Sequence, residues 1–226
     1  MSLQTILSIA ESVSINDHKF AGQMLSRNMR INVSEVLTVQ PFAFQIKPMN
    51  YLLYSQNRGV LSTLRQADRI SEQYLSFADT GWVNYIKYQG AMTNGQISAC
   101  TYDETTANKT IVLGNLPTLT PTALIVKTGD FLQIDRYSYI STADVVRGVG
   151  TTVNIPVHRT ILTSVFTGIP VVIGQYGTTV PFNGITHTGI TFPVVLREYP
   201  TYTLMPITND SYISWDGLFG AFEVVL

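Results

Sequence analysis

The chain has 226 residues, of which 45% are hydrophobic and 13% charged, and its 14 Lys and Arg nearly balance its 15 Asp and Glu. The charged fraction is about half the ~25% of an average globular chain, so much of the surface must be uncharged or buried against other chains. The balance disfavours a protein that holds nucleic acid by a basic field, and we expect no sequence-specific nucleic-acid partner. The single cysteine excludes an intrachain disulfide and a thiolate zinc site.

The sequence carries neither a membrane-spanning pattern nor a secretion pattern. No stretch reaches the ~18 consecutive apolar residues that a spanning helix needs. Residues 1–19 lack a basic segment followed by an apolar core. We therefore expect no membrane partner, and synthesis and folding in a cytoplasm.

The first part of the chain mixes strand and helix patterns. The apolar residues near the start have a spacing that fits a helix or a strand (Leu3, Ile6, Leu7, Ile9 and Ala10). Phe42, Phe44 and Ile46 alternate with less apolar residues, which predicts a strand. From residue 57 to about residue 70, apolar residues recur at three- and four-residue spacing, which predicts the one helix of the fold.

Three arginines, Arg58, Arg65 and Arg69, fall between the apolar positions of this helix. They form either an ordinary solvated face or a surface that faces a partner. Tyr212 and Trp215 lie near the end of the chain, where aromatic side chains serve equally well as core or as interface anchors. We assign these five residues to a subunit interface.

The composition changes after residue 89, where Gly, Pro, Thr, Asn and Val dominate. Turn sequences separate predicted strands at residues 110–113, 123–126, 131–134 and 152–157. Short strands spaced about ten residues apart are typical of a small barrel or sandwich. Clean strand patterns return at residues 192–196, 201–205 and 221–226.

These patterns predict a mainly β fold of two barrels. Residues 1–89 and 190–226 form one discontinuous barrel with one helix, because the terminal strands need a sheet to join, and residues 90–189 form a small barrel inserted into it. Residues 160–196 contain no charged side chain. We expect part of that segment to contact another subunit, unless Thr and Gly alone keep it soluble.

No constellation in the sequence supports catalysis or holds a cofactor or a metal ion. His18, His158 and His187 are far apart and have no second ligand at metal-binding spacing. A nucleophile elbow and a phosphate-binding loop are also missing. We therefore expect no enzyme activity, although Trp82 and Trp215 are candidate platforms for stacking a glycan.

Several segments resemble structural proteins of bacteriophage tails. The first part is similar to the tail-tube-like barrel of distal tail and baseplate hub proteins, in Ser26 to Arg30, Gln40 to Phe44, Tyr54 to Gly59 and Asp68-Arg69. The middle part resembles the small β domain inserted in many of these proteins, in Leu124 to Ile134, Thr142 to Val145 and Val153 to Arg159. Tyr212 to Val225 look like the strands that return into the first barrel.

The resemblance implies a virion protein that forms a ring, a hexamer in most relatives, at the distal tail tube or baseplate hub. Its partners would be copies of itself and other tail proteins (tube, hub and baseplate), after assembly in the host cytoplasm. The resemblance implies no catalytic residues. The alternative is a tail-fibre or receptor- or glycan-binding adaptor module, although residues 90–190 leave no room for a large carbohydrate-binding module.

Overall fold

The computed structural model describes residues 3–16, 21–25, 31–35, 41–66, 71–103, 109–162, 168–178 and 186–225. Strands account for 46% and helices for 15%, and the sheets curl like half-barrels, so the predicted mainly β class is confirmed. The chain packs as two compact units. Unit 1 comprises Ile9–Glu72 and Val194–Leu226, and unit 2 comprises Ser2–Ser8 and Gln73–Pro193.

The packed units divide after residues 72 and 193, whereas the sequence predicts domain boundaries after residues 89 and 189. Hydrogen bonds draw residues 73–89 into unit 2. The Tyr88 hydroxyl donates to the Ile125 carbonyl at 2.5 Å, and the Gln89 N–H donates to the Asp130 carboxylate at 3.1 Å. Such contacts join distant positions, so a change in composition does not reveal them.

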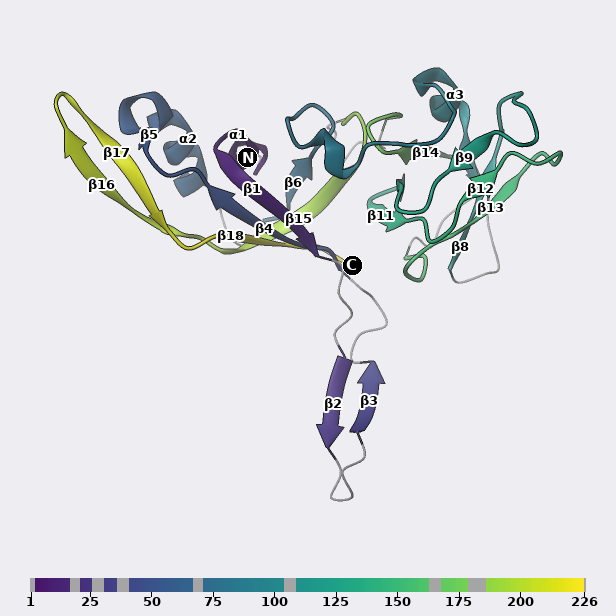
Figure 1. Ribbon diagram of the computed structural model, residues 1–226, viewed down its shortest axis with the longest axis horizontal. Coiled ribbons are helices and arrows are strands. Elements are labelled where there is room, and N and C mark those ends of the chain that lie inside the picture. The colour runs from purple at the N-terminus through teal and green to yellow at the C-terminus, as the bar shows by residue number, and fades with distance from the viewer. Residues whose placement is uncertain are drawn as a thin grey trace. The chain divides into compact units, whose positions relative to one another are not determined.

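Unit 1 contains antiparallel strands in the order β1-β4-β18-β15 (Figure 1). Their bounds are β1 Ala10–Asn16, β4 Ala43–Pro48, β15 Thr191–Glu198 and β18 Phe219–Glu223. In β4, Phe44 and Ile46 are buried while Gln45 and Lys47 are exposed, which confirms the predicted alternation. β18 pairs with β4, so the closing strand joins the sheet of the first part of the chain. β6 (Gln73–Ser76), which belongs to unit 2, neighbours β15, whose first three residues also belong to unit 2.

A second sheet of unit 1 has the order β16-β17-β5, and α2 packs against β17 and β5. The bounds are β5 Leu52–Leu53, α2 Tyr54–Gln66, β16 Thr201–Ile207 and β17 Asp210–Asp216. β15 leads directly into β16, and β17 into β18, so these four strands form one long antiparallel ribbon shared by both sheets (Figure 1). Separately, β2 (Ala21–Leu25) pairs with β3 (Ile31–Glu35).

The prediction of a single helix is wrong, because the described residues also contain α1 (Gln4–Ser8) and α3 (Asn94–Ala99). Both are too short to show helical periodicity. A capping box starts α3 instead: the Thr93 and Gln96 side chains each accept the backbone N–H of the other residue. α2 begins at Tyr54, before the predicted start, and the predicted residues 67–70 lie outside the described part. A short 3-10 helix, η1, covers Val83–Tyr85.

Unit 2 is built on a six-stranded antiparallel sheet in the order β11-β10-β14-β7-β8-β13. The bounds are β7 Thr101–Asp103, β8 Thr110–Gly114, β10 Phe131–Ile134, β11 Tyr137–Ile140, β13 Val153–Pro156 and β14 Ile169–Ile173. β9 (Leu124–Val126) and β12 (Val145–Val146) form a separate pair. The predicted strands at residues 110–113, 123–126, 131–134 and 152–157 are present as β8, β9, β10 and β13.

Gly129 supplies the backbone conformation of the turn before β10. The Asp130 N–H donates to the Lys127 carbonyl at 3.0 Å and closes the turn. Gly129 has φ +91°, and the space around it is open. Strain in the backbone is therefore the only cost of a side chain at this position.

We expect Gly129→Ala to lower the free energy of unfolding by about 1–2 kcal/mol, the cost of an L side chain in the left-handed region. Gly81→Ala is the matched control, because Gly81 also has open space and no left-handed φ. It should change that free energy by less than about 0.5 kcal/mol. Urea unfolding followed by circular dichroism measures both, and equal effects would contradict the backbone argument.

Candidate functional site

β16 forms the outer edge of its three-stranded sheet, with β17 on one side and no described strand on the other. Its seven residues carry no charge. The side chains of Leu204, Met205 and Ile207 are 43%, 45% and 39% exposed. Edge strands are normally short or protected by charged side chains. An uncharged edge of this length is therefore a surface that another strand can join.

Hydrogen bonds on the far side of β17 fix the direction of its backbone groups. The Tyr51 N–H donates to the Ile213 carbonyl at 2.8 Å. The Trp215 N–H donates to Asn50 Oδ1 at 2.7 Å. The backbone groups of Ile213 and Trp215 therefore point away from β16.

This direction determines which groups of β16 face outward. Leu204 lies opposite Ile213, and Tyr202 lies opposite Trp215. Opposite residues in an antiparallel pair exchange both backbone hydrogen bonds or neither. Because Ile213 and Trp215 direct their backbone groups away from β16, their opposite residues Leu204 and Tyr202 form no backbone hydrogen bonds with them. The N–H and C=O groups of Tyr202 and Leu204 therefore point outward from the sheet edge. Outward and inward residues alternate along the strand, so the backbone of Pro206 also faces outward. Proline has no N–H, but at this position an N–H would not have bonded to β17, so the pairing of β16 with β17 is intact. The edge thus offers two N–H groups and three carbonyls.

One face of this hairpin is held by α2. Trp215 is buried there, and the ring of Tyr202 lies edge-on to it with 5.1 Å between centroids. Arg65 of α2 donates a hydrogen bond to the Tyr202 hydroxyl, and its Cζ lies 5.3 Å from the centroid of that ring. Tyr202 thus brings together two of the predicted interface residues, although sequence reasoning did not single it out.

Trp215 is an anchor of the hairpin and not a surface group. Its side chain is 9% exposed, and the ring of Phe219 lies 5.5 Å from it on the other side. A buried ring offers no face for a sugar, so the candidate glycan platform at this position is wrong. Trp82, the other candidate, donates its Nε1–H to the Leu7 carbonyl at 3.2 Å.

Asp210 fastens the start of α2 to the tip of the hairpin. The Ser55 hydroxyl donates to Asp210 Oδ2 at 2.6 Å, and the Ser55 N–H donates to Oδ1 at 3.2 Å. Ser211 N–H adds a third bond at 2.7 Å. These bonds, the Ser55 hydroxyl first, lower the pKa of Asp210. They also satisfy an N–H of the first helical turn, which has no partner within the helix.

The other face of the hairpin carries exposed apolar side chains near the tip, among polar ones. Met205 lies opposite Tyr212 on this face, and Ile207 lies next to it at the tip. Tyr51 is 68% exposed, with its ring edge-on to that of Tyr212 at 6.3 Å. Tyr51 has φ +63°, which is uncommon for a bulky residue. The predicted interface residue Tyr212 thus lies among exposed apolar side chains, and together these residues form what we call the outer face (Tyr51, Met205, Ile207 and Tyr212).

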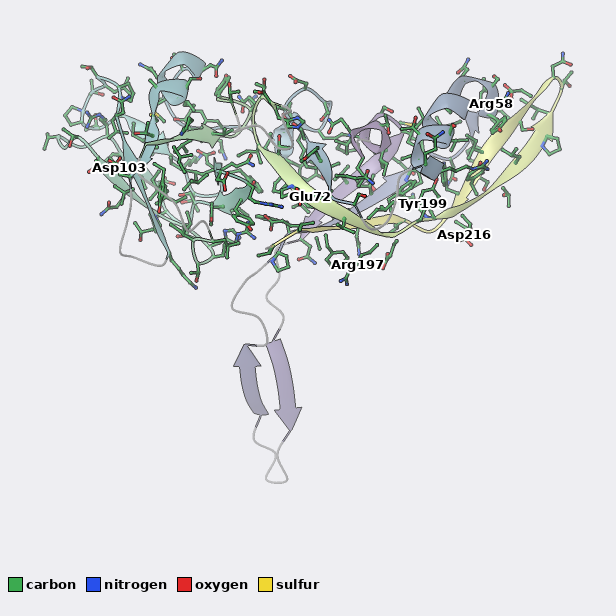
Figure 2. The ribbon with its side chains drawn as sticks, turned by 180° about the vertical axis from the view of Figure 1, so that it is seen from behind. Arg58, Glu72, Asp103, Arg197, Tyr199 and Asp216 are labelled. Atoms are coloured by element: carbon green, nitrogen blue, oxygen red, sulfur yellow. The ribbon has the colours of Figure 1, made fainter. Side chains whose placement is uncertain are left out.

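The structure describes two of the three predicted arginines, and both are exposed on α2. Arg65 donates a hydrogen bond to Tyr202, and Arg58 is labelled in Figure 2. Arg69 lies outside the described residues. Sequence reasoning missed Leu204, Met205 and Ile207, although an uncharged run before the Thr208-Asn209 turn was a usable signal.

The two described histidines, His158 and His187, have different contacts. His158 Nδ1 accepts the Ile140 N–H at 2.9 Å, and His18 lies outside the described residues. Within the described ranges, no group of three His, Cys, Asp or Glu side chains is placed to hold a metal ion. In the same ranges, no helix has the length and apolar character needed to cross a membrane. Cys100 is buried, and burial raises the pKa of its thiol to about 11.

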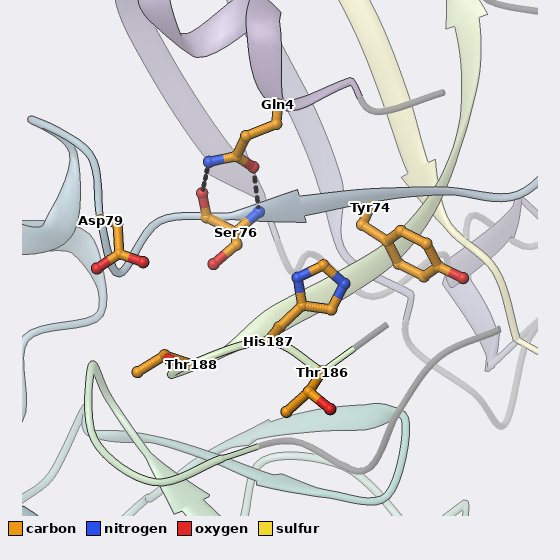
Figure 3. Close-up of a pocket in the computed structure, with 7 residues that line it drawn as sticks. All are labelled: Gln4, Tyr74, Ser76, Asp79, Thr186, His187 and Thr188. Atoms are coloured by element: carbon orange, nitrogen blue, oxygen red, sulfur yellow. Dashed lines mark hydrogen bonds between the residues drawn. The ribbon is translucent and has the colours of Figure 1, made fainter. Parts of the chain in front are cut away.

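A pocket of about 390 Å³ lies in unit 2 (Figure 3). It is lined by Gln4, Tyr74, Ser76, Asp79, Thr186, His187 and Thr188. The Gln4 amide donates to the Ser76 carbonyl at 2.6 Å and accepts the Ser76 N–H at 2.8 Å. The ring centroids of His187 and Tyr74 lie 5.1 Å apart. Burial lowers the pKa of His187. The Gln4 bonds fasten α1 to β6, which is a structural role.

We expect Asp210→Ala to weaken the fold at pH 7 and to lose its effect in acid. Because the pKa of Asp210 is lower in the folded state, its contribution is present above the ordinary value of about 3.9 and is lost as the pH falls through the folded pKa. Urea midpoints of wild type and variant should therefore converge below about pH 4. Asp216→Ala, at the exposed other end of β17, is the control and should not change the midpoint.

Arg65→Ala should lower the free energy of unfolding by about 0.5–1 kcal/mol, the value of an exposed cation–π contact. Arg58→Ala, on the same helix, should stay within about 0.5 kcal/mol of wild type. Tryptophan fluorescence should also change in the first variant, since Tyr202 lies against Trp215. An Arg58 effect as large as that of Arg65 would contradict the assigned contact.

Comparison with known proteins adds no family to this picture. No protein-family model matches the sequence, and no curated protein matches it either. The function therefore has to be argued from the free edge of β16, the outer face beside it and the patterns of the sequence.

Proposed function

We propose that this chain is a structural protein of a bacteriophage tail that assembles with copies of itself. In this proposal it forms a ring, a hexamer, at the distal tail tube or the baseplate hub, and it contacts other tail proteins. Its architecture is a discontinuous tail-tube-like barrel with a small inserted barrel. It acts in the virion by holding shape, without catalysis.

The observation that carries the proposal is the free edge of β16. An exposed, uncharged strand of this length is an aggregation hazard in a protein that stays monomeric. Copies of the same chain are present wherever the chain is made, so they are the partner that can always cover the edge. The low charge of the whole sequence fits a surface that is used for assembly.

The alternative of a receptor- or glycan-binding adaptor has less support. Its candidate platform Trp215 is buried between Tyr202 and Phe219. Four of the exposed apolar side chains of unit 1 lie along a strand edge and the outer face beside it (Tyr51, Leu204, Met205 and Ile207), an arrangement that suits a protein partner.

Purified wild-type protein should be an oligomer by light scattering and a closed ring in negative-stain images. Because β16 carries no charge, the assembly should survive a rise from about 0.1 M to 1 M salt, which shortens the Debye length from about 10 Å to about 3 Å.

Leu204→Lys should yield a folded monomer, since a charge on the edge opposes pairing. Leu218→Lys is the matched control: Leu218 is 37% exposed in the same unit but lies outside β16. It should leave the oligomer intact. A wild type that is monomeric at every concentration, or equal behaviour of the two variants, would overturn the proposal.

A further inference from the structure

Tyr51 is an exception among the residues whose backbone is left-handed. In the described part of the chain, four residues other than glycine have a positive φ, and the three besides Tyr51 are Asn115, Asp135 and Asn209. Asn and Asp are enriched in this conformation, whereas a bulky residue there is an outlier. Tyr51, with φ +63°, is therefore a tyrosine at a position that suits asparagine.

Packing within unit 1 does little to offset this strain. Tyr51 is 68% exposed, the largest fraction among the exposed large apolar residues of the unit. Its ring meets that of Tyr212 edge-on, and such a pair gains about as much free energy as a left-handed backbone costs. Strained residues gather at sites that bind a ligand or a partner. The conformation of Tyr51 thus points to a contact made outside the monomer.

Two backbone hydrogen bonds fix the segment that carries Tyr51. The Met49 N–H donates to the Ile9 carbonyl at 2.8 Å, just before β1. The Tyr51 N–H donates to the Ile213 carbonyl of β17, also at 2.8 Å. The segment is therefore tied to both sheets of unit 1. A group held in place before a partner arrives loses little conformational entropy on binding.

A pocket of about 360 Å³ lies beside Tyr51. It is lined by Glu11, Lys47, Met49, Asn50 and Tyr51. Glu11 and Lys47 are paired with each other at 3.0 Å, so the lining carries no net charge. Met49 is exposed and adds an apolar wall. Tyr and Met are enriched at protein interfaces, whose cores are poor in charge, so this lining suits an uncharged protein surface.

We infer that Tyr51 is the anchor through which a neighbouring copy of the chain docks on unit 1. This inference rests on the proposed function and adds to it the side chain that anchors the contact. Tyr is one of the residue types that dominate binding energy at interfaces.

The position of Tyr51 identifies the partner as the copy that covers β16. Tyr51 belongs both to the pocket and to the outer face beside β16, so the pocket, the outer face and the edge adjoin. Stable complexes bury at least ~1,200 Å² in total, which is more than one strand pair supplies. A copy seated on the edge must therefore extend over the surface beside it, where Tyr51 lies.

The inference predicts opposite effects of one substitution on folding and on assembly. Tyr51→Asn removes the ring but keeps a residue that tolerates the left-handed backbone. In the Leu204→Lys background, where we expect a monomer, Tyr51→Asn should keep or raise the urea midpoint. In the otherwise wild-type chain, it should raise the dissociation constant of the oligomer at least about 30-fold, the size of a hot-spot loss. Analytical ultracentrifugation measures this constant.

Two variants serve as matched controls. Asn209→Tyr places a tyrosine on a backbone with φ +67°, and in the Leu204→Lys background it should lower the urea midpoint. This control measures the strain that Tyr51 bears. Leu218→Asn removes an exposed apolar side chain of unit 1 that is not part of the outer face, and it should leave the dissociation constant unchanged.

Each outcome decides between explanations. A midpoint that Tyr51→Asn keeps or raises, together with weaker association, supports Tyr51 as the anchor. A lower midpoint would show that the ring holds the fold and would overturn the inference, as would an Asn209→Tyr variant with an unchanged midpoint. An unchanged dissociation constant, or an equal loss in Leu218→Asn, would overturn the anchor but leave the proposed function standing. A wild type that is monomeric at every concentration would overturn both.

Discussion

Backbone pairing along the ribbon of β15 to β18 holds unit 1 together. The inner half of the ribbon belongs to the sheet with β4 and β1, and the outer half belongs to the sheet with β5. Every other element of the candidate site depends on this ribbon. Asp210 at its tip fastens α2. Trp215 packs against Tyr202, and Tyr202 in turn contacts Arg65 of α2. A register change in the hairpin would exchange its buried and exposed faces and remove all these contacts together.

The arginines of α2 illustrate why a helix face cannot be read from spacing alone. Arg58 and Arg65 both fall between apolar positions, yet only Arg65 has an aromatic ring within reach. Its guanidinium is held by a contact within the chain, and an interface on α2 would have to keep or replace that contact. The exposed apolar surface beside the ribbon, not the basic face of the helix, is therefore the stronger docking surface.

The sequence could predict those features that depend on neighbouring residues. The alternation of Phe44 and Ile46 predicted β4, and the turn-separated strands of unit 2 were found near their true positions. The capping box of Thr93 and Gln96 is a local signal of the same kind, since its two residues lie three positions apart. Features that depend on pairing between distant positions could not be predicted. Trp215 is buried because the rings of Tyr202 and Phe219 lie against it. β16 is an edge strand because no strand in the described part of the chain lies beyond it in the sheet.

Pro206 and the lack of charge in β16 act in opposite directions, and together they select a partner. The lack of charge leaves the edge open to any strand, whereas the proline removes a donor at one end of it. When two copies of β16 pair, each chain lacks the N–H of its Pro206. When β16 pairs with a strand that has no proline, only one N–H is missing, and the partner strand has an N–H at every residue. An edge of this kind is therefore completed more fully by a strand without proline than by a second copy of β16.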